Sequence, residues 1–161
     1  MITFEKILIA VDNGLAADSA AKVGFELAKK FNAHVGLVHI TEPVIGAPVM
    51  TDSTMGMPMQ NANDITSVEI AEIQNEVSDN IIDHIKTKYG SDLRVSVFTE
   101  FGATADGIIK CGHDFGANII VMGSHNRSGF ERFFTGSVAE EVVRDAGIPV
   151  LVVPLRDEKA D

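Results

Sequence analysis

Short runs of apolar residues alternate along the chain with longer stretches in which apolar residues recur every three or four positions. The runs are rich in β-branched residues and largely uninterrupted, which is typical of strands buried on both faces. Five strands are predicted, at Lys6–Asp12, His34–Ile40, Leu93–Thr99, Ala117–Met122 and Ile148–Val153. Four helices are predicted between them, at about 19–32, Ser67–Tyr89, Thr104–Phe115 and Gly136–Ala146. Strict β–α alternation with right-handed crossovers predicts an α/β fold, a doubly wound, five-stranded parallel sheet.

Individual side chains predict where the first two helices begin or end, and which face of the second helix packs against the core. Asp18 or Ser19 can cap the first helix, which we expect to end near Asn32. The second helix is expected to end at Gly90. Its predicted inward face consists of apolar residues at helical spacing, namely Ile70, Ile73, Val77, Ile81 and Ile85.

Length and composition narrow the class of protein. The 161 residues suit one domain spanning 1–161, and 45% hydrophobic with 22% charged residues is ordinary globular composition. The net charge of −10 disfavours nucleic acid as a partner, because a phosphate backbone requires a basic face. Cys111 is the single cysteine, which excludes an internal disulfide framework. No apolar run is long enough for membrane insertion or a secretion signal, so we expect a cytoplasmic protein.

The segment 41–66 departs from the β–α alternation. It contains three prolines, two glycines and four of the six methionines of the chain. A connection of this length is usually functional or mobile, and methionines suit adaptable surfaces. We therefore predict a mobile insertion loop.

The candidate functional residues lie where the predicted parallel strands end. Ligands of open α/β sheets bind there, beyond the carboxyl ends of the strands. Asp12 and His39 arrive at this edge, and so does the polar stretch from Gly123 to Ser137. The pair Gly136-Ser137 opens a predicted helix, so unpaired backbone N–H groups and a hydroxyl are available to an anion.

Several of these strings resemble the universal stress protein family. They are Ile7-Leu-Ile-Ala-Val-Asp12, Val38-His39, Gly123-Ser-His, Gly136-Ser-Val-Ala-Glu-Glu-Val142 and Pro149-Val-Leu-Val-Val153. The resemblance implies the strand order 3-2-1-4-5, a homodimer through the fifth strand (Ile148–Val153), and a Rossmann-like domain that binds an adenine nucleotide. ATP-binding members carry Gly, two residues, Gly, nine residues, then Gly-Ser or Gly-Thr. The chain matches this pattern except that Asn126 replaces the second glycine.

The resemblance also implies which residues hold ATP, together with Mg²⁺. Asp12 would bind the ribose or adenine side, Val38 would contact adenine through its backbone, and Gly123 would let the backbone approach the ribose and phosphates. Gly136 and Ser137 would hold phosphate oxygens. The full implied set is Ala10, Val11, Asp12, Val38, Met122, Gly123, Ser124, His125, Asn126, Arg127, Gly136, Ser137 and Val138. The implied role is a regulatory, stress-response module whose protein partner the sequence does not identify.

Two alternatives stay open, and no residue set compels a catalytic mechanism. The first is a nucleotide-free dimeric interaction protein. The second is a metal-dependent hydrolase that uses Asp12, His39 and His125. A P-loop hydrolase and a dinucleotide dehydrogenase are excluded because their glycine motifs are absent from the sequence. Weak ATP hydrolysis or phosphotransfer stays open as an added activity.

Overall fold

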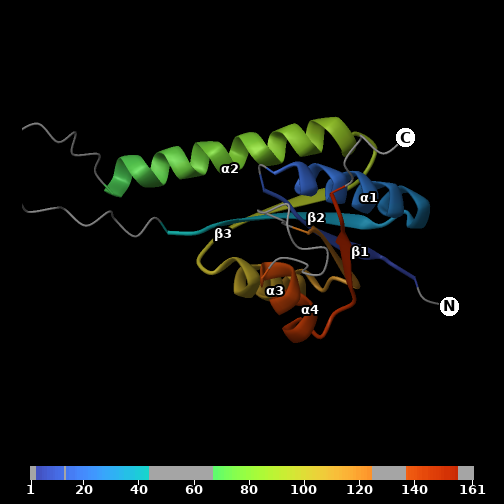
Figure 1. Cartoon of the computed structure of the whole chain (residues 1–161). Coiled ribbons are helices and arrows are strands. Elements are labelled where there is room, and N and C mark those ends of the chain that lie inside the picture. The colour runs from blue at the N-terminus through green and yellow to red at the C-terminus, as the bar shows by residue number, and fades with distance from the viewer. Residues whose placement is uncertain (1–2, 13, 44–66, 125–136, 156–161) are drawn as a thin grey trace, which may run out of the picture.

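The continuous apolar runs form one parallel sheet, and the amphipathic stretches form helices that cover both faces of it (Figure 1). This computed structural model describes residues 3–12, 14–43, 67–124 and 137–155. The strands are β1 (Lys6–Ala10), β2 (His34–Thr41), β3 (Val95–Phe101), β4 (Ile119–Gly123) and β5 (Val150–Val153). The helices are α1 (Leu15–Phe31), α2 (Ser67–Tyr89), α3 (Thr104–Phe115) and α4 (Ser137–Asp145). The order β3-β2-β1-β4-β5, with every neighbouring pair parallel, confirms the predicted α/β fold.

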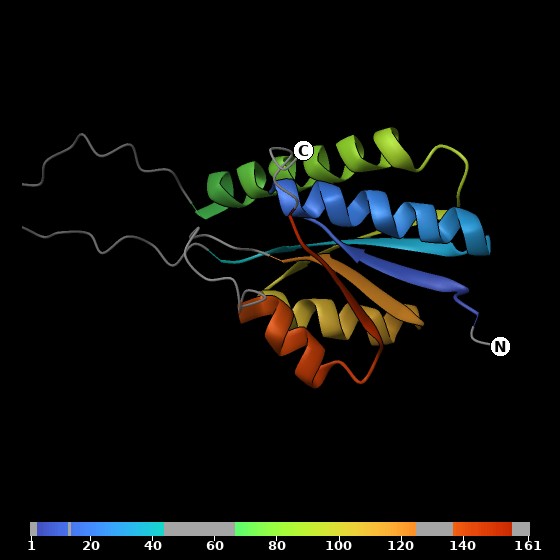
Figure 2. The same cartoon turned by 45° about the vertical axis from the view of Figure 1, so that its right-hand side comes forward.

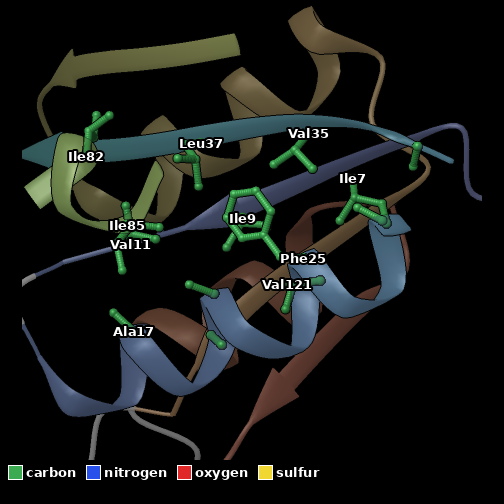
Figure 3. Packing of buried hydrophobic residues seen from close by; sticks show 14 of the residues in the cluster. Ile7, Ile9, Val11, Ala17, Phe25, Val35, Leu37, Ile82, Ile85 and Val121 are labelled. Atoms are coloured by element: carbon green, nitrogen blue, oxygen red, sulfur yellow. The ribbon is translucent and has the colours of Figure 1, made fainter. Parts of the chain in front are cut away.

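The sheet separates two layers of helices and two apolar cores. Helices α1 and α2 cover one face, and α3 and α4 cover the other (Figure 2). On the first face, Phe25 of α1 packs among isoleucines and valines of β1, β2 and β4 (Figure 3). On the second face, Leu8, Ile120 and Val142 are fully buried in a separate cluster. Because the central strands are buried on both faces, their sequences are apolar throughout rather than alternating.

Helix α1 begins earlier than its sequence predicts. It starts at Leu15, so the prediction that Asp18 or Ser19 caps it is wrong. Gly14 is the N-cap residue, and its N–H donates to Asp12 Oδ1 at 2.6 Å. Asp12 lies two residues past the end of β1, so this bond closes the turn between the strand and the helix, and no side chain of the N-cap residue caps α1.

The inward face of α2 also differs from the prediction. Ile85 is buried as expected, but Ile73 and Val77 are 54% and 46% exposed, while Ser78 is buried. The reason is that the first turns of α2 extend past the start of α1 (Figures 1 and 2), so α1 does not cover them. Ser78 faces the sheet instead, where its Oγ pairs with Thr41 Oγ1 at 3.1 Å.

The connection between β2 and α2 is described only in part. β2 continues to Thr41, and the chain is described as far as Pro43, so most of the predicted insertion 41–66 lies outside the described residues. None of the helices in the described part of the chain is both long enough and apolar enough to span a lipid bilayer.

Candidate functional site

A cavity of about 540 Å³ opens at the carboxyl edge of the sheet, on the face covered by α3 and α4. Its volume lies within the range of about 300–1,000 Å³ that is usual for small-molecule sites. The ends of β1, β2 and β4 meet the first turns of α1, α3 and α4 around it. Its lining residues are Ala10, Val11, Asp12, Ala16, Ala17, Val38, Ile40, Glu42, Thr104, Ile108, Met122, Gly123, Ser137, Val138 and Ala139.

The fold brings many of the predicted site residues together around this cavity. Those that line it are Ala10, Val11, Asp12, Val38, Met122, Gly123, Ser137 and Val138. Ser124 is not among the lining residues, and its N–H donates to the Val153 carbonyl at 2.9 Å. The other predicted residues, His125, Asn126, Arg127 and Gly136, lie outside the described residues.

The backbone of β2 offers its hydrogen-bonding groups at Ile40 rather than at Val38. The Val38 carbonyl accepts from Val11 N–H at 2.9 Å, so β1 already occupies it. Since the backbone direction alternates along a strand, Ile40 faces the same side as Val38 but lies past the last residue of β1. Val11 C=O accepts from His39 Nδ1 at 2.9 Å, and the backbone bonds described outside the regular ladders include none from Ile40 N–H. Among the described residues this N–H thus has no backbone partner beyond the strand ladders, and Ile40 lines the cavity.

Gly123 has a packing role at the end of β4. A Cβ added there would lie 2.6 Å from Ala16 O and 2.8 Å from Ala16 Cβ, closer than real Cβ contacts. The missing side chain thus lets the first turn of α1 approach β4. This role is distinct from the approach to ribose and phosphates that the sequence suggested, although Gly123 also lines the cavity.

Two polar residues of the cavity, Glu42 and Thr104, were not among the predicted site residues. Thr104 is the first residue of α3, and its Oγ1 donates to Glu42 Oε1 at 2.6 Å. Ile40 and Ile108 line the cavity beside them. A signal existed in the sequence, because Val38, Ile40 and Glu42 follow the period of two that places side chains on one face of a strand.

A second cavity, of about 470 Å³, lies on the opposite face of the sheet between α1 and α2. Asp12 lines both cavities. Beside the second, Lys88 Nζ donates to Asp18 Oδ1 at 2.8 Å, and Tyr89 Oη donates to Asp18 Oδ2 at 3.0 Å. Burial raises the pKa of Asp18, but the hydrogen bonds from Lys88 and Tyr89 outweigh it, so the pKa lies below its usual value. The charges of Asp18 and Lys88 beside this cavity are thus paired with each other.

The metal-site alternative gains no support from this arrangement. His39 precedes Ile40 on β2, so its side chain lies on the other face of the sheet from the first cavity. The described residues contain no group of three or more His, Cys, Asp or Glu side chains placed to hold a metal, and His125 lies outside them. Cys111 is buried, and burial raises the pKa of its thiol to about 11, which keeps it protonated at neutral pH.

Comparison with known proteins agrees with the fold. The sequence profile of the universal stress protein family matches residues 3–154. The chain belongs to this family. Universal stress protein MJ0531 of Methanocaldococcus jannaschii is 30% identical over 152 residues, which cover 93% of this chain and 82% of that protein.

Solved structures of family members superpose over almost the whole chain. Universal stress protein UspA from Lactobacillus plantarum has a TM-score of 0.73 at 18% identity, covering 95% of this chain and 99% of its own. A universal stress protein solved in complex with cAMP has a TM-score of 0.64 at 16% identity, covering 95% of this chain and 98% of its own. At these identities the likeness shows that the fold is shared.

Proposed function

We propose that the cavity between β1, β2 and β4 binds an adenine nucleotide, ATP with Mg²⁺, and that the protein is a cytoplasmic regulatory module of the stress response. The observation that carries the proposal is that the two ends of the cavity differ in chemical character. The start of α4 lies at one side of it, and an apolar wall formed by Ile40 and Ile108 lies at the end of β2 and the start of α3. This arrangement suits a ligand with one anionic end and one flat, apolar end. The proposed function is binding, with no catalytic step assigned.

The α4 side suits the phosphates. Ser137, Val138 and Ala139 are the first residues of α4, and all three line the cavity. The first N–H groups of a helix lack partners within the helix and carry its positive dipole end, so they bind anions without a cationic side chain. Because the whole chain carries a net charge of −10, we include a divalent cation that offsets the charge of the triphosphate.

The β2 side suits the base. Val38, Ile40 and Ile108 give it apolar walls, and Ile40 N–H supplies a donor for a ring nitrogen. The role that the sequence analysis gave to the Val38 backbone therefore passes to Ile40 in this proposal. A universal stress protein of the same fold was solved with cAMP, an adenine nucleotide, which supports the choice of base.

The test is to place a negative charge where the phosphates would bind. Ser137→Asp adds a carboxylate at the start of α4, which stabilises a helix N-terminus but repels phosphate. We expect an unchanged or higher Tm and a loss of ATP affinity of at least about 100-fold by calorimetry, given the strength of charged hydrogen bonds. Ser91→Asp makes the same charge change at an exposed turn before β3 and should bind ATP normally. If both variants bind ATP like the wild type, the α4 terminus is not the phosphate site.

We also propose that the chain forms a homodimer through β5. This strand is an edge of the sheet, its four residues Val150–Val153 are apolar, and each is only partly buried within one chain. Pro149 C=O accepts from β4 and Val153 C=O accepts from Ser124, the residue after β4. By alternation, Val150 and Val152 therefore direct their backbone groups away from the sheet. An apolar edge of this kind favours pairing with a second strand.

A lysine substitution on β5 tests whether the dimer interface lies at this strand or elsewhere on the surface. Val152→Lys should convert the dimer to a monomer in sedimentation experiments, because an edge lysine opposes strand pairing. Ile73→Lys introduces the same charge at an exposed apolar position on α2 and should leave the dimer intact. A dimer that Ile73→Lys dissociates and Val152→Lys does not would place the interface on α2.

A further inference from the structure

A hydrogen-bonded pair, Glu42 and Thr104, occupies the β2 end of the cavity. Thr104 Oγ1 donates to Glu42 Oε1 at 2.6 Å, and both residues line the cavity beside Ile40 and Ile108. Glu42 follows Ile40 by two positions on the same face of the chain. The carboxylate therefore lies close to the place that the proposed function assigns to the base.

The backbone around Glu42 is held from two sides. From α2, Gln74 Nε2 donates to Glu42 C=O at 3.2 Å, and Ser78 Oγ pairs with Thr41 Oγ1. From the turn after β3, Gly102 N–H donates to Thr41 C=O at 3.1 Å. Together with the Thr104 bond, these contacts fix the position of a side chain that lies at the protein surface.

The hydrogen-bonding properties of a carboxylate distinguish adenine from other purine bases. An ionised carboxylate only accepts hydrogen bonds, and it repels both phosphate and carbonyl oxygens. Adenine presents an acceptor, N1, beside an amino group, N6. Hypoxanthine presents the reverse pattern, a donor at N1–H beside the O6 carbonyl. Ile40 N–H requires an acceptor and Glu42 requires a donor, so the two protein groups match adenine and mismatch 6-oxopurines.

We propose that Glu42 determines base specificity in this cavity, by accepting a hydrogen bond from the 6-amino group of adenine and excluding purines with a 6-carbonyl. Thr104 holds the carboxylate in place. This inference rests on the proposed function, because it assigns the base to the β2 end. Sites that pair a buried or held polar group with a substrate amino group reject analogues that lack it.

The experiment compares ATP and ITP as their magnesium complexes, by calorimetric titration of three proteins. The wild type should bind ATP at least about 30-fold more tightly than ITP, since two hydrogen bonds are replaced by repulsions. Glu42→Gln should lower this ratio about tenfold, because a carboxamide can turn its NH₂ group towards O6. Glu72→Gln removes the same charge from an exposed position on α2 that lines neither cavity, and should keep the wild-type ratio.

The other outcomes separate this inference from the proposed function. If Glu42 only tethers α3 through Thr104, Glu42→Gln lowers the Tm and weakens both nucleotides equally, and the unchanged ratio overturns the inference. A wild type that binds ATP and ITP equally overturns it as well, while the proposed nucleotide site stands. A wild type that binds neither nucleotide overturns both.

Discussion

Helices α1 and α4 both begin at the carboxyl edge of the sheet, but their first turns meet different partners. At α1, the protein supplies its own anion, because Asp12 Oδ1 accepts from the N–H of the N-cap residue Gly14 at 2.6 Å. At α4, the first residues Ser137 and Val138 line the cavity of about 540 Å³. The first turns of both helices line this cavity, since Ala16 and Ala17 of α1 also border it, but at α1 the N–H of the N-cap residue is already engaged by a carboxylate of the chain. We therefore expect an anionic ligand at the start of α4 rather than at the start of α1, where a carboxylate already accepts from the N-cap residue.

The largest expected effect comes from forcing α1 away from the sheet. Gly123→Val places atoms within 3 Å of the Ala16 backbone, so α1 must shift. We expect the free energy of unfolding to fall by about 3 kcal/mol and the Tm by roughly 10 °C. Thr99→Val on the exposed side of β3 is the control and should change stability by less than about 0.5 kcal/mol. Equal stability of Gly123→Val and wild type would contradict the close packing of α1 on β4.

A smaller effect is expected from removing the carboxylate that engages α1. Asp12→Ala loses the acceptor of the Gly14 N–H bond and should lower the free energy of unfolding by about 1 kcal/mol, measured by urea denaturation. Asp12→Asn keeps an acceptor oxygen, so most of that stability should return.

The same two variants test whether Asp12 also serves the ligand. Both variants should bind ATP about tenfold more weakly than wild type, because alanine has no side-chain acceptor and the neutral amide of asparagine accepts hydrogen bonds more weakly than a carboxylate. If Asp12→Asn restores affinity along with stability, Asp12 acts only as the acceptor of the Gly14 N–H bond.

The smallest effect concerns Asp18, in the first turn of α1. Its pKa is lowered in the folded protein, so the bonds from Lys88 and Tyr89 stabilise the fold above about pH 3.8 and are lost as the pH falls through the lowered value. Asp18→Asn should lower the Tm at pH 7 by about 2 °C, as expected for a solvent-exposed ion pair. The difference between the variant and wild type should shrink as the pH is lowered from 5 to 2. A difference that stays constant over this range would mean that the charge of Asp18 contributes nothing.

Much of the fold could be predicted because each element is locally consistent. Helices α2 and α3 have the predicted bounds, and the uninterrupted apolar runs of β1 and β4 indicated strands buried on both faces. The failures arose from two kinds of contact that helical periodicity does not reveal, one local and one tertiary. The start of α1 depends on the local bond from Gly14 N–H to Asp12 Oδ1, and the outward position of Val77 follows from the extension of α2 past α1.

Part of the candidate site could also be predicted from the sequence, and part required the tertiary fold. Asp12, Gly123 and Ser137 could be placed at one edge because parallel strands end together. The roles of Val38 and Ile40 could not be distinguished without the register of β1 on β2, which shows that the Val38 carbonyl is already paired. Glu42 and Thr104 come from the ends of two different elements, and only the tertiary fold brings their side chains within 2.6 Å.

The most direct test of the central claim is a calorimetric titration of the full chain with ATP, with Mg²⁺ present and then with a chelator. We expect saturable binding of one ATP per chain in the presence of Mg²⁺. We also expect an affinity about tenfold lower with the chelator, because the chain carries a net charge of −10 and the triphosphate then lacks its counterion. Absence of saturable binding at millimolar ATP in the presence of Mg²⁺ would contradict the account and favour a nucleotide-free interaction protein.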